Sequence, residues 1–294
     1  MNARILLLLL VCANLHGCKM TAGGVDIGAI TQIGANLSQL GGIKQPQELA
    51  LGDDFAAMLL GASRLHPNTA LQHYVNSVGR YLASHSNRPD LPWTFGILDT
   101  PDLNAFAIPG GYVFITSGLL ANLQSEAELA AVLAHEISHI NQRHHLQQLE
   151  RDNSINFISN LASTALTYHD QRNPGGSKNE YRNRQIAESV LNAGHQLYSK
   201  GLSRDDELEA DTLAIRLAAR AGYDPYAMAT VLQQLESISA DSNAISLMLA
   251  THPAASERLN HIEQQLDKLE QRYPSVGADK LNLQQRYLAA LSKK

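Results

Sequence analysis

The sequence predicts an α+β fold that is mainly helical, with a small β-sheet beside one well-defined helix. Apolar residues recur at helical spacing over most of the chain, whereas only two short runs, Trp93–Leu98 and Tyr112–Thr116, are rich in β-forming residues. The best-supported helix follows the second run and contains His135-Glu136-Ile137-Ser138-His139 in its interior. We therefore expect a small sheet set among helices.

Capping sequences mark where two of the helices begin. Ser125 and Ser203 each precede a helical pattern, and an acidic residue follows three positions later, as in a capping box. Gly222 is expected to end the second of these helices. The sequence contains no internal repeat. The predicted helices cover residues 47–62, 69–85, 125–147, 203–222, 226–239 and 253–272.

Composition and charge limit the classes of function. The chain has 294 residues, of which 44% are apolar and 17% charged, an ordinary mixture for one large globular domain or two small ones. The formal net charge is -5, and no long run of Lys or Arg occurs. No nucleic acid partner is expected, because the basic patch that would bind it is missing.

The first residues have the pattern of an export signal. A short positive start and the apolar run Ile5–Val11 predict a signal peptide over residues 1–17. Leu15-His16-Gly17-Cys18 resembles a bacterial lipobox, so Cys18 is the candidate lipidation site; the alternative is an ordinary signal peptide that contains a cysteine. Since Lys19 rather than Asp follows, the sorting rule for such lipoproteins indicates the outer membrane. The expected location is the periplasm, with a lipid anchor.

The rest of the chain divides by composition. Residues 18–45 are rich in Gly, Ala, Thr and Gln and are expected to form a flexible tether after the lipidated cysteine. One domain is expected over residues 46–275, with a mobile loop at 171–184. Residues 276–294 are expected to form a C-terminal helical tail.

The segment His135–His139 has the spacing of a zinc site. Two histidines four positions apart lie on one face of a helix, so His135 and His139 can both reach one Zn²⁺. Glu136 follows the first histidine, where its carboxylate can activate a water molecule. The plainer alternative is two exposed helix histidines beside a surface glutamate.

A catalytic zinc site also needs a third protein ligand and an open fourth position. Glu207 lies in the first turn of the helix that Ser203 opens, and is the candidate third ligand. Asp211, one turn later on the same face, is a candidate hydrogen-bond partner for a ligating histidine. The alternative is that these carboxylates only complement the helix dipole near the helix start.

These motifs together resemble a known family. His135–His139 and Glu207-Leu208-Glu209-Ala210-Asp211 resemble the HExxH and ExxAD pair of the HtpX/BepA/LoiP-type zinc metallopeptidases, which are gluzincins. Asn104–Gly111 and Thr251–Pro253 are similar to further segments of this family, and the resemblance covers about residues 48–262. It implies that the domain is a zincin-like metallopeptidase. Some members continue into a long array of helical repeats, which this sequence does not match.

The resemblance also implies a role for each matched residue. It implies one Zn²⁺ per chain, with Glu136 as the catalytic base and Asp211 as the catalytic partner that orients a ligand. The implied zinc ligands are His135, His139 and Glu207, and the implied substrate-binding residues are Asn104, Ala105, Phe106 and Gly111.

Two assignments have open alternatives. The strand Tyr112–Thr116 is either the sheet edge to which an extended substrate adds as a further strand, or a core strand. By resemblance, His252 is a removable fourth ligand that regulates the metal; the alternative is a loop histidine before a helix that begins at Pro253. The histidines without supporting context are expected to be surface or structural residues, namely His144, His145, His195 and His261.

The predicted function is that of a zinc-dependent endopeptidase of the bacterial cell envelope. It would hydrolyse peptide bonds of misfolded or stalled envelope proteins, which are the expected partners, as proteolytic quality control. Outer-membrane assembly machinery is a candidate partner as well. The alternative from another class is a lipid-anchored periplasmic chaperone or outer-membrane protein assembly factor with a latent zinc site.

Overall fold

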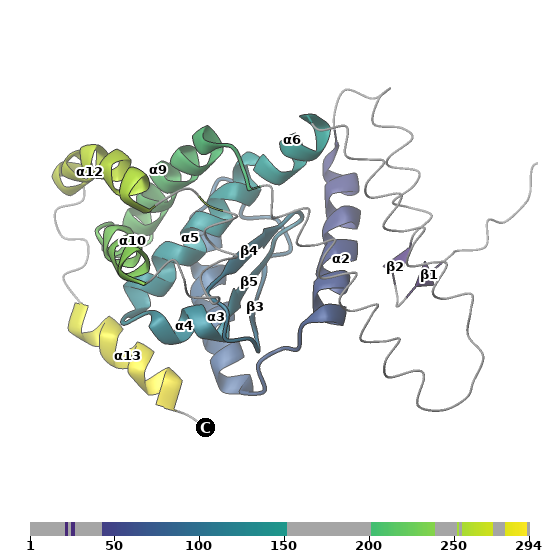
Figure 1. Cartoon of the computed structure of the whole chain (residues 1–294), viewed down its shortest axis with the longest axis horizontal. Coiled ribbons are helices and arrows are strands. Elements are labelled where there is room, and N and C mark those ends of the chain that lie inside the picture. The colour runs from purple at the N-terminus through teal and green to yellow at the C-terminus, as the bar shows by residue number, and fades with distance from the viewer. Residues whose placement is uncertain are drawn as a thin grey trace, which may run out of the picture.

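A computed structural model describes residues 21–22, 25–26, 43–151, 201–238, 252, 255–272 and 280–292 (Figure 1). The fold is α+β and mainly helical with one small sheet, as the sequence predicts. The predicted signal peptide, the lipidation site at Cys18, the loop at 171–184 and His195 lie outside these residues. The strands are β1 (Thr21–Ala22), β2 (Val25–Asp26), β3 (Thr94–Leu98), β4 (Ala105–Ile108) and β5 (Tyr112–Thr116). The helices are α2 (Gln45–Ala62), α3 (Thr69–Ser84), α4 (Ser117–Asn122), α5 (Glu126–Gln142), α6 (His144–Arg151), α9 (Arg204–Arg220), α10 (Ala227–Ser237), α12 (Ala255–Arg272) and α13 (Lys280–Ser292).

The three longer strands form a mixed sheet in the order β3-β5-β4. β5 pairs in parallel with β3 and antiparallel with β4, so Tyr112–Thr116 has a hydrogen-bonded neighbour on each side. The prediction that this strand is the sheet edge is therefore wrong, and the alternative of a core strand is confirmed. Within the described residues the outer strands are β3 and β4, and the sequence pattern did not indicate β4 as a strand.

Alternate residues of the strands pack on opposite faces of the sheet. Val113 and Ile115 of β5 belong to the larger core, which includes residues of α3 and α5, whereas Phe114 belongs to a second core with residues of α2. α2 therefore covers one face of the sheet, and α3 and α5 cover the other (Figure 1).

The helix that contains the histidine pair, α5, is fixed at both ends. Ser125 caps its start through Oγ, which accepts a hydrogen bond from the Glu128 amide at 3.2 Å. The helix ends at Gln142, because Arg143 has a left-handed backbone conformation with a φ of 60°. The predicted end near Gln147 is therefore wrong, since the chain turns at Arg143 and continues as α6.

α9 packs along α5, and this is the most extensive contact between two described elements. A capping box opens α9, as predicted: Ser203 Oγ accepts from the Asp206 amide at 3.2 Å, and the Asp206 carboxylate accepts from the Ser203 amide at 3.3 Å. This start fixes Glu207 in the first turn of the helix. Both helices bury alanines, whose small side chains allow close packing: Ala130, Ala134, Ala210 and Ala214.

The last helix, α13, lies within the predicted C-terminal tail and packs against α5 and α3. Tyr287 is fully buried and donates a hydrogen bond to the Leu120 carbonyl. Arg286 binds the buried carboxylate of Glu126 in the first turn of α5. Among the helices that the structure describes, none combines the length and the apolar character needed to cross a membrane.

Gly52 of α2 lies very close to the turn between β4 and β5. A Cβ atom on Gly52 would lie 2.0 Å from the Pro109 carbonyl oxygen, whereas one on Gly61 of the same helix would meet nothing within 4 Å. Because the carbonyl can move only with the turn, we expect Gly52→Ala to lower the free energy of unfolding by about 3 kcal/mol. The control Gly61→Ala should instead raise it by up to about 1 kcal/mol, because alanine favours a helix. Urea unfolding measures both, and equal midpoints would contradict the close approach.

Candidate metal centre

The two histidines of α5 lie on one helix face and meet in the interior. His135 and His139 are 3% and 1% exposed, and their Nε2 atoms are 2.9 Å apart. Two ligand nitrogens bonded to one tetrahedral zinc ion at about 2.0–2.1 Å are separated by roughly 3.3 Å. The helix thus already presents both imidazoles to a single point.

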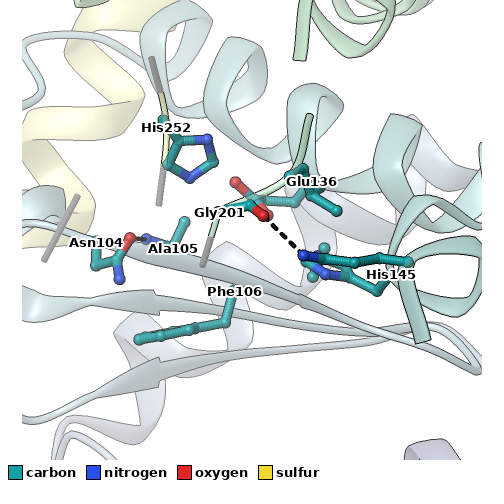
Figure 2. A pocket seen from close by; sticks show the side chains of 10 residues that line it. Asn104, Ala105, Phe106, Glu136, His145, Gly201 and His252 are labelled. Carbon is teal, nitrogen blue, oxygen red and sulfur yellow. Dashed lines mark hydrogen bonds between the residues drawn. The ribbon is translucent and has the colours of Figure 1, made fainter. Parts of the chain in front are cut away.

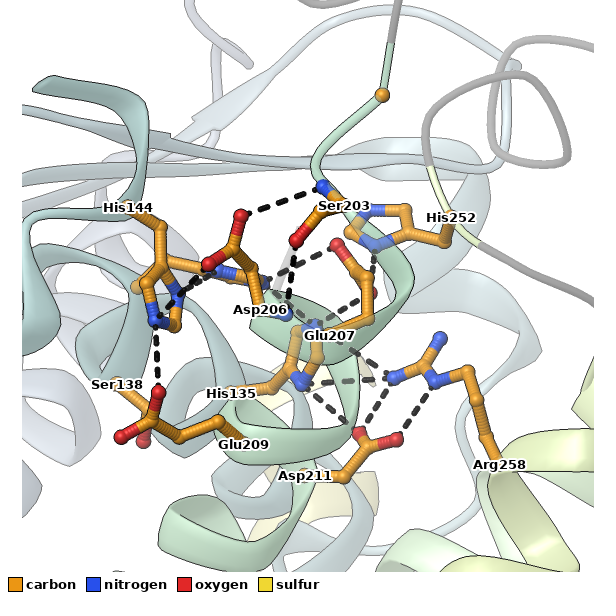
Figure 3. A network of polar contacts seen from close by, with 12 residues as sticks. His135, Ser138, His144, Ser203, Asp206, Glu207, Glu209, Asp211, His252 and Arg258 are labelled. Atoms are coloured by element: carbon orange, nitrogen blue, oxygen red, sulfur yellow. Dashed lines mark hydrogen bonds and ion pairs between the residues drawn. The ribbon is translucent and has the colours of Figure 1, made fainter. Parts of the chain in front are cut away.

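α9 brings Glu207 to the same point (Figure 3). Its side chain is fully buried, with Oε2 3.5 Å from His135 Nε2 and Oε1 3.5 Å from His139 Nε2. Oε1 has no hydrogen-bond partner within the described residues. A buried carboxylate oxygen without a donor is unfavourable unless a cation binds it. Two imidazoles and a carboxylate that converge in this way form a donor set that fits zinc.

His252 is the fourth member of this cluster. Its Nδ1 lies 2.8 Å from Glu207 Oε2, and its ring centroid is 5.5 Å from that of His135. The four residues each offer one ligand atom, and these atoms lie within 4.8 Å of one another. His252 therefore contacts the predicted ligands rather than standing apart from them.

A buried ion pair lies behind His135. Asp211 Oδ1 is 3.0 Å from His135 Nδ1, at the position predicted for a partner that orients the ring. Arg258 of α12 binds Asp211 with both arms of its guanidinium, Nε to Oδ2 at 2.8 Å and Nη2 to Oδ1 at 2.6 Å (Figure 3). Arg258 was not predicted. The sequence could have indicated this ion pair, because an arginine on the buried face of an amphipathic helix needs an acidic partner.

His144 contacts the second histidine of the pair. It was expected to be only a surface or structural residue, but it is 1% exposed, and its Nδ1 lies 2.9 Å from His139 Nδ1. Its Nε2 is 3.5 Å from Glu209 Oε2. No local sequence signal marks this role, because the turn at Arg143 brings the ring back to α5. His261, by contrast, bonds Thr212 Oγ1 at 2.9 Å on the surface of α9 and α12, as a structural residue would.

Glu136 lies at a cavity between α5 and the edge strand β4 (Figure 2). The residues Asn104–Ala107 line one side of this cavity, and His145 and His252 also line it. A second cavity beside Glu136 has mainly apolar walls, which include Met228, Val231 and Leu232 of α10. Glu136 is thus the one acidic side chain that borders both cavities, among the residues that the structure describes.

Three of the four predicted substrate-binding residues lie at this cavity. Asn104, Ala105 and Phe106 line it, and Asn104 Nδ2 is buried without a hydrogen-bond partner in the described part of the chain. Gly111 does not line either cavity at Glu136. It lies in the turn before β5 with a φ of 107°, where a Cβ atom would meet the Trp93 backbone at 3.4 Å. The structure therefore explains this glycine by the turn and not by a place at the cavity.

Burial and neighbouring charges shift the pKa values of Glu136 and Glu207 in opposite directions. Burial raises the pKa of the Glu136 carboxyl. Burial alone would also raise the pKa of Glu207, but His252 and His139 outweigh it and hold that pKa well below its usual value. Burial lowers the pKa of His139, so its imidazole is neutral and available as a ligand. The site thus combines an ionised candidate ligand, Glu207, with a carboxylate that accepts a proton more readily, Glu136.

The chain is similar to known peptidases over the part that forms this centre. Residues 69–266 match the sequence model of peptidase family M48. The matched span is about two thirds of the chain and contains the histidine pair, Glu207, Asp211, His252 and Arg258.

Individual relatives match over most of the chain. The beta-barrel assembly-enhancing protease of Escherichia coli is 32% identical over 216 residues, which are 72% of this chain and 42% of that protein. The protein of the same name from Yersinia pestis is 31% identical over 267 residues, or 90% of this chain and 51% of the relative. The mitochondrial metalloendopeptidase OMA1 of Schizosaccharomyces pombe is 30% identical over 201 residues, which are 68% of this chain and 54% of that protein. The chain thus spans about half the length of the curated relatives it matches.

Proposed function

Because the chain belongs to peptidase family M48, we propose that it is a zinc-dependent endopeptidase that hydrolyses peptide bonds of misfolded or stalled envelope proteins. The observation that carries this proposal is the convergence of two histidines and Glu207 beside Glu136, at a cavity along a strand edge. The names of the relatives, a protease and a metalloendopeptidase, support the same activity.

We propose one Zn²⁺ per chain, with His135, His139 and Glu207 as its ligands. Nitrogen ligands combined with a carboxylate are the donor set of catalytic zinc sites. Zinc, when bound, supplies Lewis-acid activation of water and of the scissile carbonyl. Asp211 holds His135 through Nδ1, which leaves Nε2 of that ring directed toward Glu207.

Glu136 is the proposed general base. Its carboxylate takes a proton from the attacking water and then passes it to the leaving amine nitrogen. The raised pKa of this buried carboxyl supports the role, because a base with a higher pKa takes up the proton more readily.

The proposed substrate is an extended segment of an unfolded protein that adds as a strand beside β4. Main-chain hydrogen bonds to a sheet edge depend little on sequence, so such a site accepts varied proteins. Ala105 of the outer strand β4 lines the same cavity as Glu136, and this position supports the mode. Asn104 Nδ2 is available to donate a hydrogen bond to a substrate carbonyl, since it has no partner among the described residues.

We assign the enzyme to the periplasm, anchored to the outer membrane by a lipid on Cys18. The signal-like residues 1–17 and the lipobox-like Leu15–Cys18 support this location. The name of the bacterial relatives, beta-barrel assembly-enhancing protease, supports a link with outer-membrane assembly machinery and with misassembled β-barrel proteins as substrates.

Metal removal tests the proposed activity. The purified protein is expected to contain about one zinc ion per chain and to cleave unfolded casein, and a chelator should stop cleavage until zinc is restored. The Glu207→Ala variant should lose both the bound zinc and the cleavage activity, because one of the three proposed ligands is missing. Asp205→Ala, an exposed acid in the same helical turn, is the control that should keep both. Bound zinc without cleavage would favour the chaperone alternative, and a protein without zinc would contradict the metal site.

We further propose that His252 holds the site in a latent form. Its contact with Glu207 and its place in the cavity wall support this role, because an entering substrate must displace it. His252→Ala is expected to raise kcat/KM for a short peptide by about tenfold, equivalent to the loss of a contact worth about 1.4 kcal/mol, with the zinc content unchanged. A peptidase assay with elemental analysis measures both. Lower activity in the variant would instead indicate that His252 assists catalysis.

A further inference from the structure

The C-terminal end of α5 has an uncommon backbone conformation. Arg143 has a φ of 60°, and in the described part of the chain it is the only residue other than glycine with a positive φ. A left-handed residue after a helix is usually glycine, because a side chain makes this conformation unfavourable. A charged residue at such a position needs a compensating interaction of its side chain, because the backbone conformation costs free energy.

The Arg143 side chain, which is 35% exposed, contacts the buried carboxylate of Glu48 of α2. Glu48 is 1% exposed, and its Oε2 lies 3.4 Å from Arg143 Nε, an ion contact rather than a strong hydrogen bond. Arg88 binds the same carboxylate with both Nη atoms, at 2.8 and 2.9 Å, and donates to the Ile140 carbonyl at 3.1 Å. Arg143 also donates to the Ile43 carbonyl. One carboxylate therefore holds both the left-handed residue and the arginine that caps the last turn of α5.

This turn determines where His144 lies. His144 directly follows Arg143, and its Nδ1 contacts His139 Nδ1 at 2.9 Å. The other nitrogen of His139, Nε2, points toward His135 and Glu207. A hydrogen bond to the second nitrogen of a ligating imidazole fixes the orientation of the ring, and its loss typically weakens metal binding by about 10–100-fold. The ion cluster and the metal centre are thus connected through two adjacent residues.

We propose that Glu48, Arg88 and Arg143 form a positioning cluster, which holds His144 against His139 and thereby sets the zinc affinity from outside the metal centre. The inference rests on the zinc site of the proposed function, and not on the identity of the substrate. In this proposal α2 covers the sheet and also, through Glu48, fixes the end of α5, the helix that contains the proposed ligands His135 and His139. A purely structural cluster would stabilise the fold and leave the metal centre unchanged.

Arg143→Gly distinguishes these two roles. Glycine removes the contacts with Glu48 and with the Ile43 carbonyl but suits a φ of 60°, and these opposing effects should leave the global stability close to that of the parent. Because His144 is no longer held, zinc affinity should fall by about tenfold in competition with a chelator. The visible spectrum of the Co²⁺-substituted protein should change with it. Parental zinc affinity and an unchanged Co²⁺ spectrum would overturn the proposal.

Two further variants complete the test. Glu48→Gln keeps the side-chain shape but removes the charge that both arginines share, so it should reproduce the loss of zinc affinity. Arg286→Gln is the matched control, because it breaks the ion pair with Glu126 at the opposite end of α5. This control should lower stability while zinc affinity and the Co²⁺ spectrum stay as in the parent. An equal loss of affinity in the control would overturn the assignment to this cluster.

Amide hydrogen exchange of the metal-free protein separates this inference from the proposed function. The Gln147 amide of α6 donates to the Arg143 carbonyl at 2.9 Å, and it should exchange about tenfold faster in Arg143→Gly and Glu48→Gln. A parent protein that binds no zinc would contradict the proposed function. Unchanged exchange in α6 would overturn the positioning role whether or not zinc binds.

Discussion

Replacement of Glu136 by glutamine is expected to lower kcat for hydrolysis of an unfolded protein by about 10²- to 10⁴-fold while the zinc content stays at the parental value. The amide has the shape of the carboxylate but cannot accept a proton from water. Glu136 is 4% exposed and, among the described residues, is the one carboxylate that lines the two cavities beside the histidine pair. Within the part of the chain that the structure describes, no neighbouring acid can therefore take over its role.

Mass spectrometry of the cleavage products and elemental analysis for zinc measure the two quantities. Glu128→Gln is the matched control, because Glu128 is also a buried acid of α5 but serves as an acceptor for the Gln124 amide at 2.8 Å. A glutamine oxygen can accept that bond, so this control should keep parental cleavage. Cleavage by Glu136→Gln at the parental rate would contradict the role of base. If both variants, like the parent, hold unfolded proteins without cutting them, the chaperone alternative gains support.

The helices of the metal centre could be predicted because their signals are local. Ser125 and Ser203 mark two helix starts through side-chain capping, and the four-residue spacing of the histidines needs only the helix period. The position of Glu207 in the first turn of a capped helix made it the candidate third ligand, and the resemblance to the metallopeptidase family implied the same residue. The structure supplies the reason: α9 packs along α5.

The sheet was harder to predict, because strand order depends on pairing between distant residues. β5 has the β-branched and aromatic residues of a buried strand, and the sequence identified its bounds at Tyr112–Thr116. β4 has only four residues, and two of them are alanines, so its composition gives no strand signal. Its position as the outer strand follows only from its antiparallel pairing with β5.

The residues that contact the candidate ligands from behind are brought there by contacts that no local sequence pattern contains. His144 reaches His139 only because Arg143 turns the chain, and that turn involves Glu48 and Arg88, which are far away in the sequence. A helix end would be expected at a glycine, so the continuous apolar spacing suggested a longer helix. The error in the predicted end of α5 and the failure to foresee His144 therefore have one cause.

Arg258→Met is expected to lower the free energy of unfolding by about 3–5 kcal/mol, the usual cost of removing one partner from a buried ion pair. Arg258 is 6% exposed and Asp211 is fully buried, so methionine leaves a carboxylate in the interior without its counter-charge. Zinc affinity should also fall by up to about tenfold, because Asp211, which contacts the His135 ring, loses the arginine that fixes its position. Glu263→Met, at an exposed position of the same helix, should change stability by no more than about 0.5 kcal/mol.

The double variant Arg258→Met with Asp211→Asn separates charge from packing. With both charges removed, no unpaired ion is buried, so most of the lost stability should return. Zinc affinity should stay weak, because a neutral amide holds the imidazole less strongly than a carboxylate does. Urea unfolding gives the stability and chelator competition gives the zinc affinity. Measured on the parent, both single variants and the double variant, they form a double-mutant cycle. A double variant as unstable as Arg258→Met would mean that the arginine contributes through its packing in α12, and that neutralisation of Asp211 is not its main role.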